Sequence, residues 1–309
     1  MRNAFVETML GTPSGAEVRM HSMMPDRGIR AAVHINHGMA EHSARYERFA
    51  RSLVAQGYAV YAHDHRGHGG THAPDAPKGV FGSKFGFEKV IADVLAVNAR
   101  IRASDPDMKV ICFGHSMGSI IALNFALRHP DLVAGLACWN AGVTTGGLTA
   151  ASRLILGSES LFRGRNKASG IAKKLTFDAW NKEFKPTRTE FDWLSRDPDE
   201  VGKYVADPQC GFDVSIGLWL DLMEGIYYGA NDHNLAALSR DMPVHIQGGA
   251  KDPCSNHGED MKKLTIRLGK AGLTDVSCSI LPDTRHESLN EINRDATTDA
   301  FLSWLNARF

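Results

Sequence analysis

Residues 110–129 constrain the fold of this chain most, because they require a buried strand to turn directly into a helix. The apolar run at 110–113 suits a strand buried on both faces, and 119–129 carries apolar residues at helical spacing. The turn between them reads Gly-His-Ser-Met-Gly at 114–118. Glycines on both sides of a serine permit a tight turn that holds the serine hydroxyl above the sheet. The pattern predicts that Ser116 is a catalytic nucleophile.

Strand-like and helix-like segments alternate along most of the chain. Strands are predicted at 31–36, 58–62, 110–113, 132–139, 243–249 and 275–281, and helices at 46–56, 87–102, 119–129, 261–270 and 292–309. Two earlier runs, 5–10 and 17–22, flank a Thr-Pro-Ser-Gly turn and predict an antiparallel pair. Alternation of this kind favours a parallel sheet covered by helices on both faces. The predicted fold class is therefore α/β with a mostly parallel sheet.

The alternation lapses from 142 to 240, which is longer than any loop of a compact domain. We interpret 142–240 as a helical cap inserted into a core domain made of 1–141 and 241–309. Within it, apolar residues including Trp219 and Met223 recur at helical spacing. Such a face either packs as core or lines an acyl pocket, and we predict the pocket. Nine Lys and Arg against three Asp and Glu over 153–188 predict a basic rim for anionic lipid surfaces or, alternatively, an ordinary solvated face.

The composition narrows the class of protein. Thirty-five basic and 35 acidic residues leave no net charge, which argues against a nucleic-acid partner. Glu7 interrupts the apolar run that a secretory signal would need, and no later segment reaches membrane-spanning length, so we predict a cytoplasmic protein. Five cysteines lack paired spacing, which argues against disulfides and zinc knuckles. Cys112, Cys138 and Cys278 fall in predicted strands and are expected to be buried.

A serine nucleophile needs two partners later in the chain. Its hydroxyl requires a base, and the base requires an acid that orients it. The order serine, acid, histidine is expected, with the last two in loops just past strand ends. Asp252 follows the predicted strand at 243–249, and His286 follows the strand at 275–281. We therefore predict a catalytic triad of Ser116, Asp252 and His286.

Competing acids and histidines fit this placement less well. Asp241 precedes its strand, Asp260 stands at a helix start, and Asp283 is too close in sequence to the histidine to come from a separate strand end. His245 lies inside a strand, and His257 sits in the loop after the acid. These five residues are predicted to have other roles.

The segment around His63, His65 and His68 suggests metal binding at first sight. The three histidines match the start of a His-x-His-x-Asp-His binuclear zinc signature, but Gly67 stands where the aspartate ligand belongs. We interpret the segment as a tight turn beside the site and predict no metal.

Five short motifs, taken together, resemble the monoacylglycerol lipase and lysophospholipase group of α/β-hydrolase fold serine hydrolases. They are His-Gly-Met-Ala-Glu-His-Ser at 37–43, Asp-His-Arg-Gly-His-Gly at 64–69, Gly-His-Ser-Met-Gly at 114–118, Lys-Asp-Pro at 251–253 and Arg-His-Glu at 285–287. The resemblance implies an α/β-hydrolase core, the Ser-Asp-His triad, a cap over an acyl pocket and no cofactor. It also implies an oxyanion hole made by the backbone N–H groups of Met39 and Met117. The alternative for Met39 is a plain strand-to-helix loop.

Glu41 and Arg45 follow the expected oxyanion loop. The resemblance suggests that polar residues here meet the alcohol part of the substrate. Alternatively, the two residues pair at i,i+4 spacing and only brace the loop.

The leading functional hypothesis is hydrolysis of carboxylic esters of monoacyl lipids through an acyl-enzyme, with a small-molecule acyl ester or monoacyl lipid as the expected partner. Transient contact of the cap with a membrane surface is a further hypothesis. An aminopeptidase-like amidase on the same fold is a second hypothesis; it needs acidic groups in the cap, for which 197–200 is a candidate. A hydrolase-fold binding protein without catalysis is the third. The sequence leaves acyl length, the alcohol and the oligomeric state open.

Overall fold

The computed structural model describes residues 4–309, so residues 1–3 of the predicted core lie outside it. Eight strands form one sheet in the order β1-β2-β4-β3-β5-β6-β7-β8. β1 pairs antiparallel with β2, and β2 antiparallel with β4, whereas all other neighbours are parallel. The carboxyl ends of the six parallel strands therefore lie side by side along one edge of the sheet, across the strand direction. The strands are β1 (Val6–Gly11), β2 (Glu17–Met23), β3 (Ala31–Asn36), β4 (Tyr58–His63), β5 (Val110–His115), β6 (Gly135–Trp139), β7 (Val244–Gly249) and β8 (Val276–Leu281).

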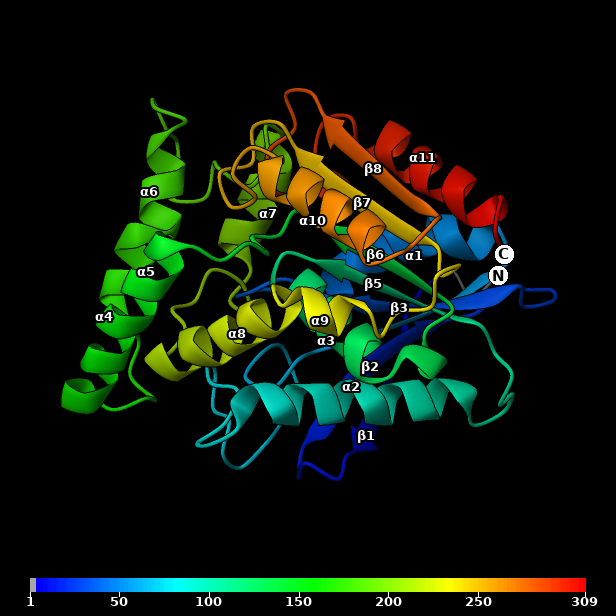
Figure 1. Ribbon diagram of the computed structural model, residues 1–309, viewed down its shortest axis with the longest axis horizontal. Coiled ribbons are helices and arrows are strands. Elements are labelled where there is room, and N and C mark those ends of the chain that lie inside the picture. Colours follow the sequence, from blue (N-terminus) through cyan, green and yellow to red (C-terminus); the bar gives the residue numbers. More distant parts are fainter. Residues whose placement is uncertain (1–3) are drawn as a thin grey trace.

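Helices cover both faces of this sheet (Figure 1). One face carries α1 (Glu47–Ala55) and α11 (Arg294–Asn306), and the other carries α2 (Gly86–Arg102), α3 (Met117–Arg128) and α10 (Glu259–Lys270). Side chains along β5 alternate between the two layers: Ile111 and Phe113 pack toward α1 and α11, whereas Cys112 packs toward α3. This arrangement confirms the predicted α/β-hydrolase fold.

The segment between β6 and β7 is helical, as expected. It contains α4 (Gly147–Arg163), α5 (Gly170–Leu175), α6 (Phe177–Lys182), α7 (Pro198–Ala206), α8 (Ile216–Gly229) and α9 (Asp232–Leu235). Helices α4 to α6 lie at the end of the molecule opposite the two termini (Figure 1). In contrast, α8 packs against α2 and α3 of the core as well as against α4. Part of the insertion is thus built into the core layer, and its division at 142 and 240 stays a prediction.

Two local predictions need correction. The strand expected at 132–139 begins only at Gly135, because Pro130–Leu132 form a short 3-10 helix (η2). Cys278 is exposed, because β8 is the edge strand of the sheet and its outer face is open to solvent. Cys112 and Cys138 are buried as expected, and none of the cysteines forms a disulfide within residues 4–309. Over the same residues, no helix is both long and apolar enough to cross a bilayer.

Candidate active site

Ser116 sits at the sharp turn from β5 into α3. Its φ of 56° and ψ of −121° lie in a region that residues other than glycine rarely adopt. Steric contacts explain why the flanking positions 114 and 118 are glycines. A Cβ on Gly114 would lie 2.2 Å from the carbonyl oxygen of Gly118, and a Cβ on Gly118 would lie 2.0 Å from that of Asn36. The strand and helix can approach this closely only because both positions lack a side chain.

His286 and Asp252 meet at the same sheet edge, in the loops that follow β8 and β7. Nδ1 of His286 lies 2.9 Å from Oδ1 of Asp252. The carboxylate is fully buried and accepts further hydrogen bonds from Asn140 Nδ2, Ser255 Oγ and the Cys254 amide. Burial alone would raise the pKa of Asp252, but His286 and these donors outweigh burial and hold the pKa below its usual range. The Asp252 carboxylate can therefore stay ionised beside the His286 imidazole.

Ser116 and His286 line one cavity. Met39 also lines it, and Met117 is the first residue of α3. The insertion supplies the opposite wall, where the Trp193 ring lies with its centroid 4.7 Å from that of His286. Ser116, His286 and Met39, whose amide is predicted to bind the oxyanion, thus line a common space that apolar side chains partly close off.

The competing residues have partners elsewhere. Trp139 Nε1 donates to His245 Nδ1 at 2.9 Å, and burial lowers the pKa of His245 to about 4. His257 Nε2 lies 3.4 Å from Glu183 Oε2, and Asp260 accepts from Thr144 Oγ1. Asp241 accepts from Ser239 Oγ, and Asp283 occupies a turn with a φ of 55°. The contact with His286 is made by Asp252.

We propose Asp252 as the triad acid and predict a large loss on its replacement. Asp252→Asn should lower kcat by about 10⁴, because the amide no longer orients the imidazole or stabilises its charged form. Asp283→Asn is the matched control, since Asp283 lies three residues before His286 without contacting its ring nitrogen. It should change kcat less than about threefold. Steady-state kinetics on one soluble ester measure both, and similar losses in the two variants would rule out the assignment.

Glu41 and Arg45 form a brace. Glu41 is 3% exposed, and its Oε1 accepts from the Gly38 amide at 2.6 Å and from Tyr46 OH at 2.9 Å. Arg45 pairs with Glu41 and, through both terminal nitrogens, with Glu287 next to the histidine. Because both carboxylate oxygens of Glu41 already accept hydrogen bonds from protein groups, the geometry favours the bracing alternative over contact with an alcohol group.

Trp219 and Met223 line a second cavity, which Ser116 does not line. It lies between α4, α5 and α8 and is lined mainly by apolar side chains. Phe177 lines the first cavity, and its ring centroid lies 5.7 Å from that of Trp219. One aromatic side chain, Phe177, therefore lies between the predicted acyl-binding face and the cavity that Ser116 lines.

The histidine segment at 63–68 forms part of a buried cluster. We call His34, His37, His63, His65 and His68 the histidine cluster; their rings approach one another with centroids 4.5 to 5.3 Å apart. His37 Nε2 accepts from the His65 amide at 2.9 Å, and its Nδ1 donates to the Gly38 carbonyl at 2.7 Å. The cluster thus supports the loop that begins at Gly38.

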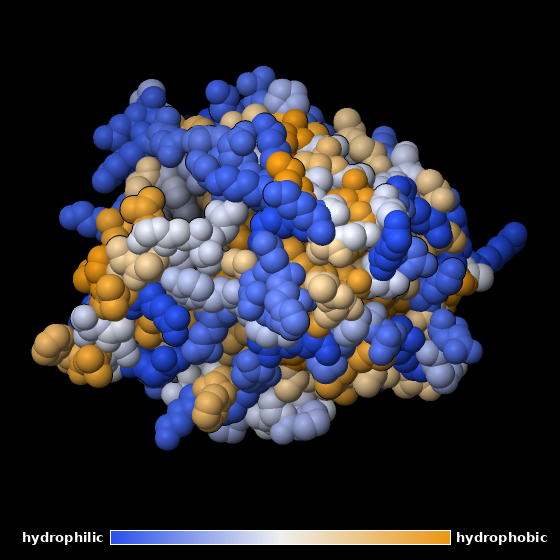
Figure 2. Space-filling model, viewed as in Figure 1, coloured by the Kyte–Doolittle hydropathy of each residue, from blue (hydrophilic) through white to orange (hydrophobic). Residues whose placement is uncertain are grey.

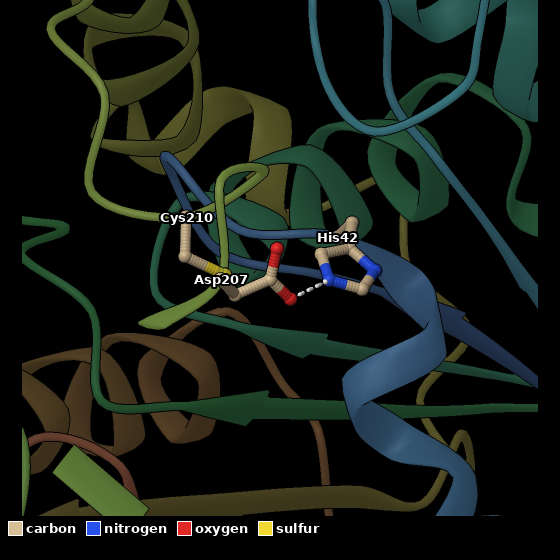
Figure 3. A group of neighbouring side chains, drawn as sticks. All are labelled: His42, Asp207 and Cys210. Atoms are coloured by element: carbon tan, nitrogen blue, oxygen red, sulfur yellow. Dashed lines mark hydrogen bonds and ion pairs between the residues drawn. The ribbon is translucent and has the colours of Figure 1, made fainter. Parts of the chain in front are cut away.

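Two groups of side chains within residues 4–309 bring three metal-binding donor atoms within 4.8 Å of one another. One is Asp252, Cys254 and His286. Burial raises the pKa of the Cys254 thiol, and the other two members already bind each other through His286 Nδ1 and Asp252 Oδ1. The other is His42, Asp207 and Cys210, drawn in Figure 3. There too, burial raises the pKa of the thiol.

Sequence reasoning missed several residues around the site. Asn140 and Ser255 hold the acid, Trp193 covers the histidine, and Phe177 and Tyr204 line the cavity. The aromatic residues all come from the insertion, where helical periodicity alone does not show which face looks toward the sheet. The unusual density of aromatic residues over 177–212 was the available signal.

Comparison with known proteins agrees with this geometry. The profile of the family described as "Serine aminopeptidase, S33" matches residues 27–293. A monoacylglycerol lipase of Mycolicibacterium smegmatis is 26% identical over 295 residues, covering 91% of this chain and 90% of that protein. A monoglyceride lipase homolog of monkeypox virus is 30% identical over 179 residues, so the chain spans 56% of that relative.

Among solved structures, a thermostable carboxyl esterase from Bacillus coagulans, crystallised with glycerol, superposes with a TM-score of 0.85. The match covers 99% of both chains at 24% identity, which establishes a shared fold. Because the family profile covers most of the chain and the sheet has the matching topology, this protein belongs to the serine aminopeptidase S33 family of α/β hydrolases.

Proposed function

We propose that this protein hydrolyses carboxylic esters of monoacyl lipids through an acyl-enzyme at Ser116. The observation that carries the proposal is the cavity in which Ser116 and the His286–Asp252 pair face apolar side chains of the insertion. Such a cavity combines a nucleophile with a water-poor wall that suits an acyl chain.

The chemistry proceeds in two halves. The Ser116 hydroxyl attacks the ester carbonyl carbon while His286 takes its proton, and the N–H groups of Met39 and Met117 receive the negative oxygen. The carbon–oxygen bond to the alcohol then breaks, and His286 returns the proton to the departing alcohol. Water repeats the sequence on the acyl-enzyme: His286 removes a proton from the water, and the fatty acid leaves as the serine hydroxyl is restored.

Several apolar side chains support an acyl substrate. Phe177, Phe191, Trp193, Leu194 and Phe212 line the cavity opposite Ser116. The relative from Mycolicibacterium smegmatis is named a monoacylglycerol lipase, which agrees with this reading.

The outer surface of α4 suits contact with a lipid surface. Leu148, Leu154, Leu161 and Phe162 on this helix are exposed, Phe162 to 90%, and apolar side chains gather at this end of the molecule (Figure 2). Two basic residues of the 153–188 stretch, Arg153 and Arg163, belong to the same helix. Apolar side chains surrounded by cations favour binding to an anionic membrane surface.

The amidase alternative finds less support. Asp197 caps α7 and pairs with Arg294, and Glu200 pairs with Arg48 and Lys203. Neither residue lines the cavity of Ser116, so the expected binding group for a substrate amine is occupied elsewhere.

A panel of substrates tests the proposal. We expect hydrolysis of p-nitrophenyl esters and of a monoacylglycerol, with kcat/KM rising from the acetyl to the octanoyl ester, because each added methylene buries apolar surface in the cavity. Aminoacyl anilides should react at least about 10²-fold more slowly. Faster cleavage of the anilides would favour the amidase, and no turnover of any substrate would favour a binding protein.

Variants of the wall between the two cavities complete the test. Phe177→Ala should join the cavities and shift the preference toward longer acyl chains. Trp219→Ala should lower kcat/KM for long esters more than for the acetate. Ile266→Ala, an exposed position on α10, is the control and should leave the profile unchanged. An unchanged length profile in both aromatic variants would show that the second cavity does not receive the acyl chain.

A further inference from the structure

The loop that follows β3 is held from inside the core at its first residue. We call residues 38–40 the oxyanion loop, because they surround the proposed Met39 amide. The Gly38 amide donates to Glu41, and the Gly38 carbonyl accepts from His37. A Cβ on Gly38 would lie 2.7 Å from Oε1 of Glu41, so the core side of the loop has no spare room. The contact with His37 fixes the peptide that joins Gly38 to Met39, and the end of the loop at Ala40 is held by other partners.

The last residue of the oxyanion loop is held from the insertion. Ala40 has a φ of 54°, in the left-handed region that favours glycine, and it is 2% exposed. Its carbonyl oxygen accepts two hydrogen bonds, from Tyr204 OH and from the Gly211 amide, each at 2.9 Å. Both donors lie in residues 204–211, more than 160 positions along the chain. A strained backbone conformation persists when surrounding contacts hold it, and here two of those contacts come from the insertion.

We infer that Tyr204 is a positioning residue that, together with the Gly211 amide, holds the oxyanion loop in the shape that directs the Met39 N–H toward Ser116. The inference rests on the proposed function, since it concerns the oxyanion hole of that reaction. The carbonyl of Ala40 has two acceptor sites, and both are used. This oxygen belongs to the peptide that joins Ala40 to Glu41, so fixing it holds the end of the oxyanion loop that follows Met39. An oxyanion hole acts because its donors are oriented before the charge develops.

A second contact joins the segment after β3 to residues 204–211. His42 Nε2 lies 2.8 Å from Oδ2 of Asp207, and Cys210 stands beside them (Figure 3). The distance is that of a hydrogen bond, and the pKa of Asp207 stays below its usual range because this bond and the Gln209 amide outweigh burial. Because the Arg45 cation interacts with the Cys210 thiol and His42 already binds Asp207, we assign the group as a contact between the two segments and not as a metal site.

The ring of Tyr204 has separate contacts that its hydroxyl does not share. The Arg45 guanidinium lies 4.8 Å from the ring centroid, and Phe191 packs against the ring at 5.0 Å. Arg45 in turn binds Glu287, the neighbour of His286. Replacing tyrosine with phenylalanine keeps these contacts and removes only the hydrogen bond to Ala40. The hydroxyl can therefore be tested by itself.

The test compares Tyr204→Phe with Tyr228→Phe, a control on α8 whose ring packs on Arg128. We expect Tyr204→Phe to lower kcat for a p-nitrophenyl ester about 10-fold, with KM changed less than about twofold, because only the transition state uses the oxyanion hole. The Ki of a trifluoromethyl ketone, which forms a tetrahedral oxyanion with the serine, should rise by the same factor. The Ki of the corresponding alcohol should stay constant, and the control should match the wild type in all four constants.

Other results would overturn the inference. Unchanged kcat and ketone affinity in Tyr204→Phe would show that the hydroxyl does not position the loop. Equal losses for ketone and alcohol would indicate general damage to the cavity. If Tyr204→Phe does not fold, Asp207→Ala should show the same split at a few-fold size, and its absence would contradict the inference. Failure of a fluorophosphonate to label Ser116 in the wild type would instead refute the proposed function.

Discussion

Ser116→Ala is expected to lower kcat by on the order of 10⁶, leaving the rate that the oxyanion hole and binding supply alone. The variant should keep its fold, because Ser116 is half-buried and its backbone amide still donates to the Trp139 carbonyl. Ester kinetics under single-turnover conditions measure the residual rate. Ser303→Ala, at an exposed position on α11, is the matched control and should retain full activity. A folded Ser116→Ala protein with more than a few per cent of wild-type kcat would disprove the nucleophile assignment.

Ser116→Gly separates the role of the backbone from that of the hydroxyl. Glycine adopts the positive φ of this turn without steric cost, whereas alanine and serine do not. Ser116→Gly should therefore be as inactive as Ser116→Ala but more stable by about 1 kcal/mol in the free energy of unfolding. Urea denaturation of the two variants gives the difference. A Ser116→Gly protein less stable than Ser116→Ala by about 0.4–1 kcal/mol, the entropic cost of glycine alone, would show that the elbow stores no strain at this residue.

The second large effect concerns stability in mild acid. Burial lowers the pKa of His34 and His68 to about 3 and that of His37 to about 4. It also lowers the pKa of His63 and His65 well below the usual value. In the unfolded chain each imidazole titrates near 6.5, so the unfolded state binds more protons as the pH falls below that value. The stability of the neutral cluster is present above about pH 6.5 and is lost as the pH falls toward 4.

The size of this loss follows from the number of protons taken up on unfolding. Each proton contributes about 1.4 kcal/mol per pH unit, so even two of the five histidines give roughly 3 kcal/mol per unit. This is a large part of the 5–15 kcal/mol, roughly, that a domain has in total. His115 acts at higher pH than the cluster: its contacts with Glu41 outweigh burial and raise its pKa, so the stability that it contributes is fully present below about pH 6.5 and is lost as the pH rises above that value. The carboxylates with lowered pKa, such as Asp64, act in the same direction as the cluster but only at more acidic pH.

Urea unfolding measured from pH 7.5 to 5 tests the prediction. The midpoint should fall steeply below pH 6.5, and His34→Gln should reduce the slope by about one proton because it removes one buried imidazole. His233→Gln, at an exposed position on α9, is the control and should leave the slope unchanged. A midpoint independent of pH over this range would mean that the cluster does not resist protonation.

The sequence by itself determined the fold class and the residues proposed as the triad. Strand and helix periods are local properties, so the alternation of apolar residues indicated the parallel sheet before any contact was known. The elbow could be recognised in the sequence because positions 114 and 118 have no room for a side chain and are therefore glycines. Asp252 and His286 were found because residues just past parallel strands meet at one edge, whatever the remaining loops do.

Only the tertiary structure decided which side chains surround these residues. Trp219 was expected at the acyl site but lines the second cavity, while Trp193 and Tyr204 reach the catalytic loops. Cys278 is exposed because β8 is an edge strand, which its own sequence does not reveal. The direction of a side chain in the insertion depends on how helices far apart in the chain pack together. That packing arises from contacts between distant segments, and no local period encodes it.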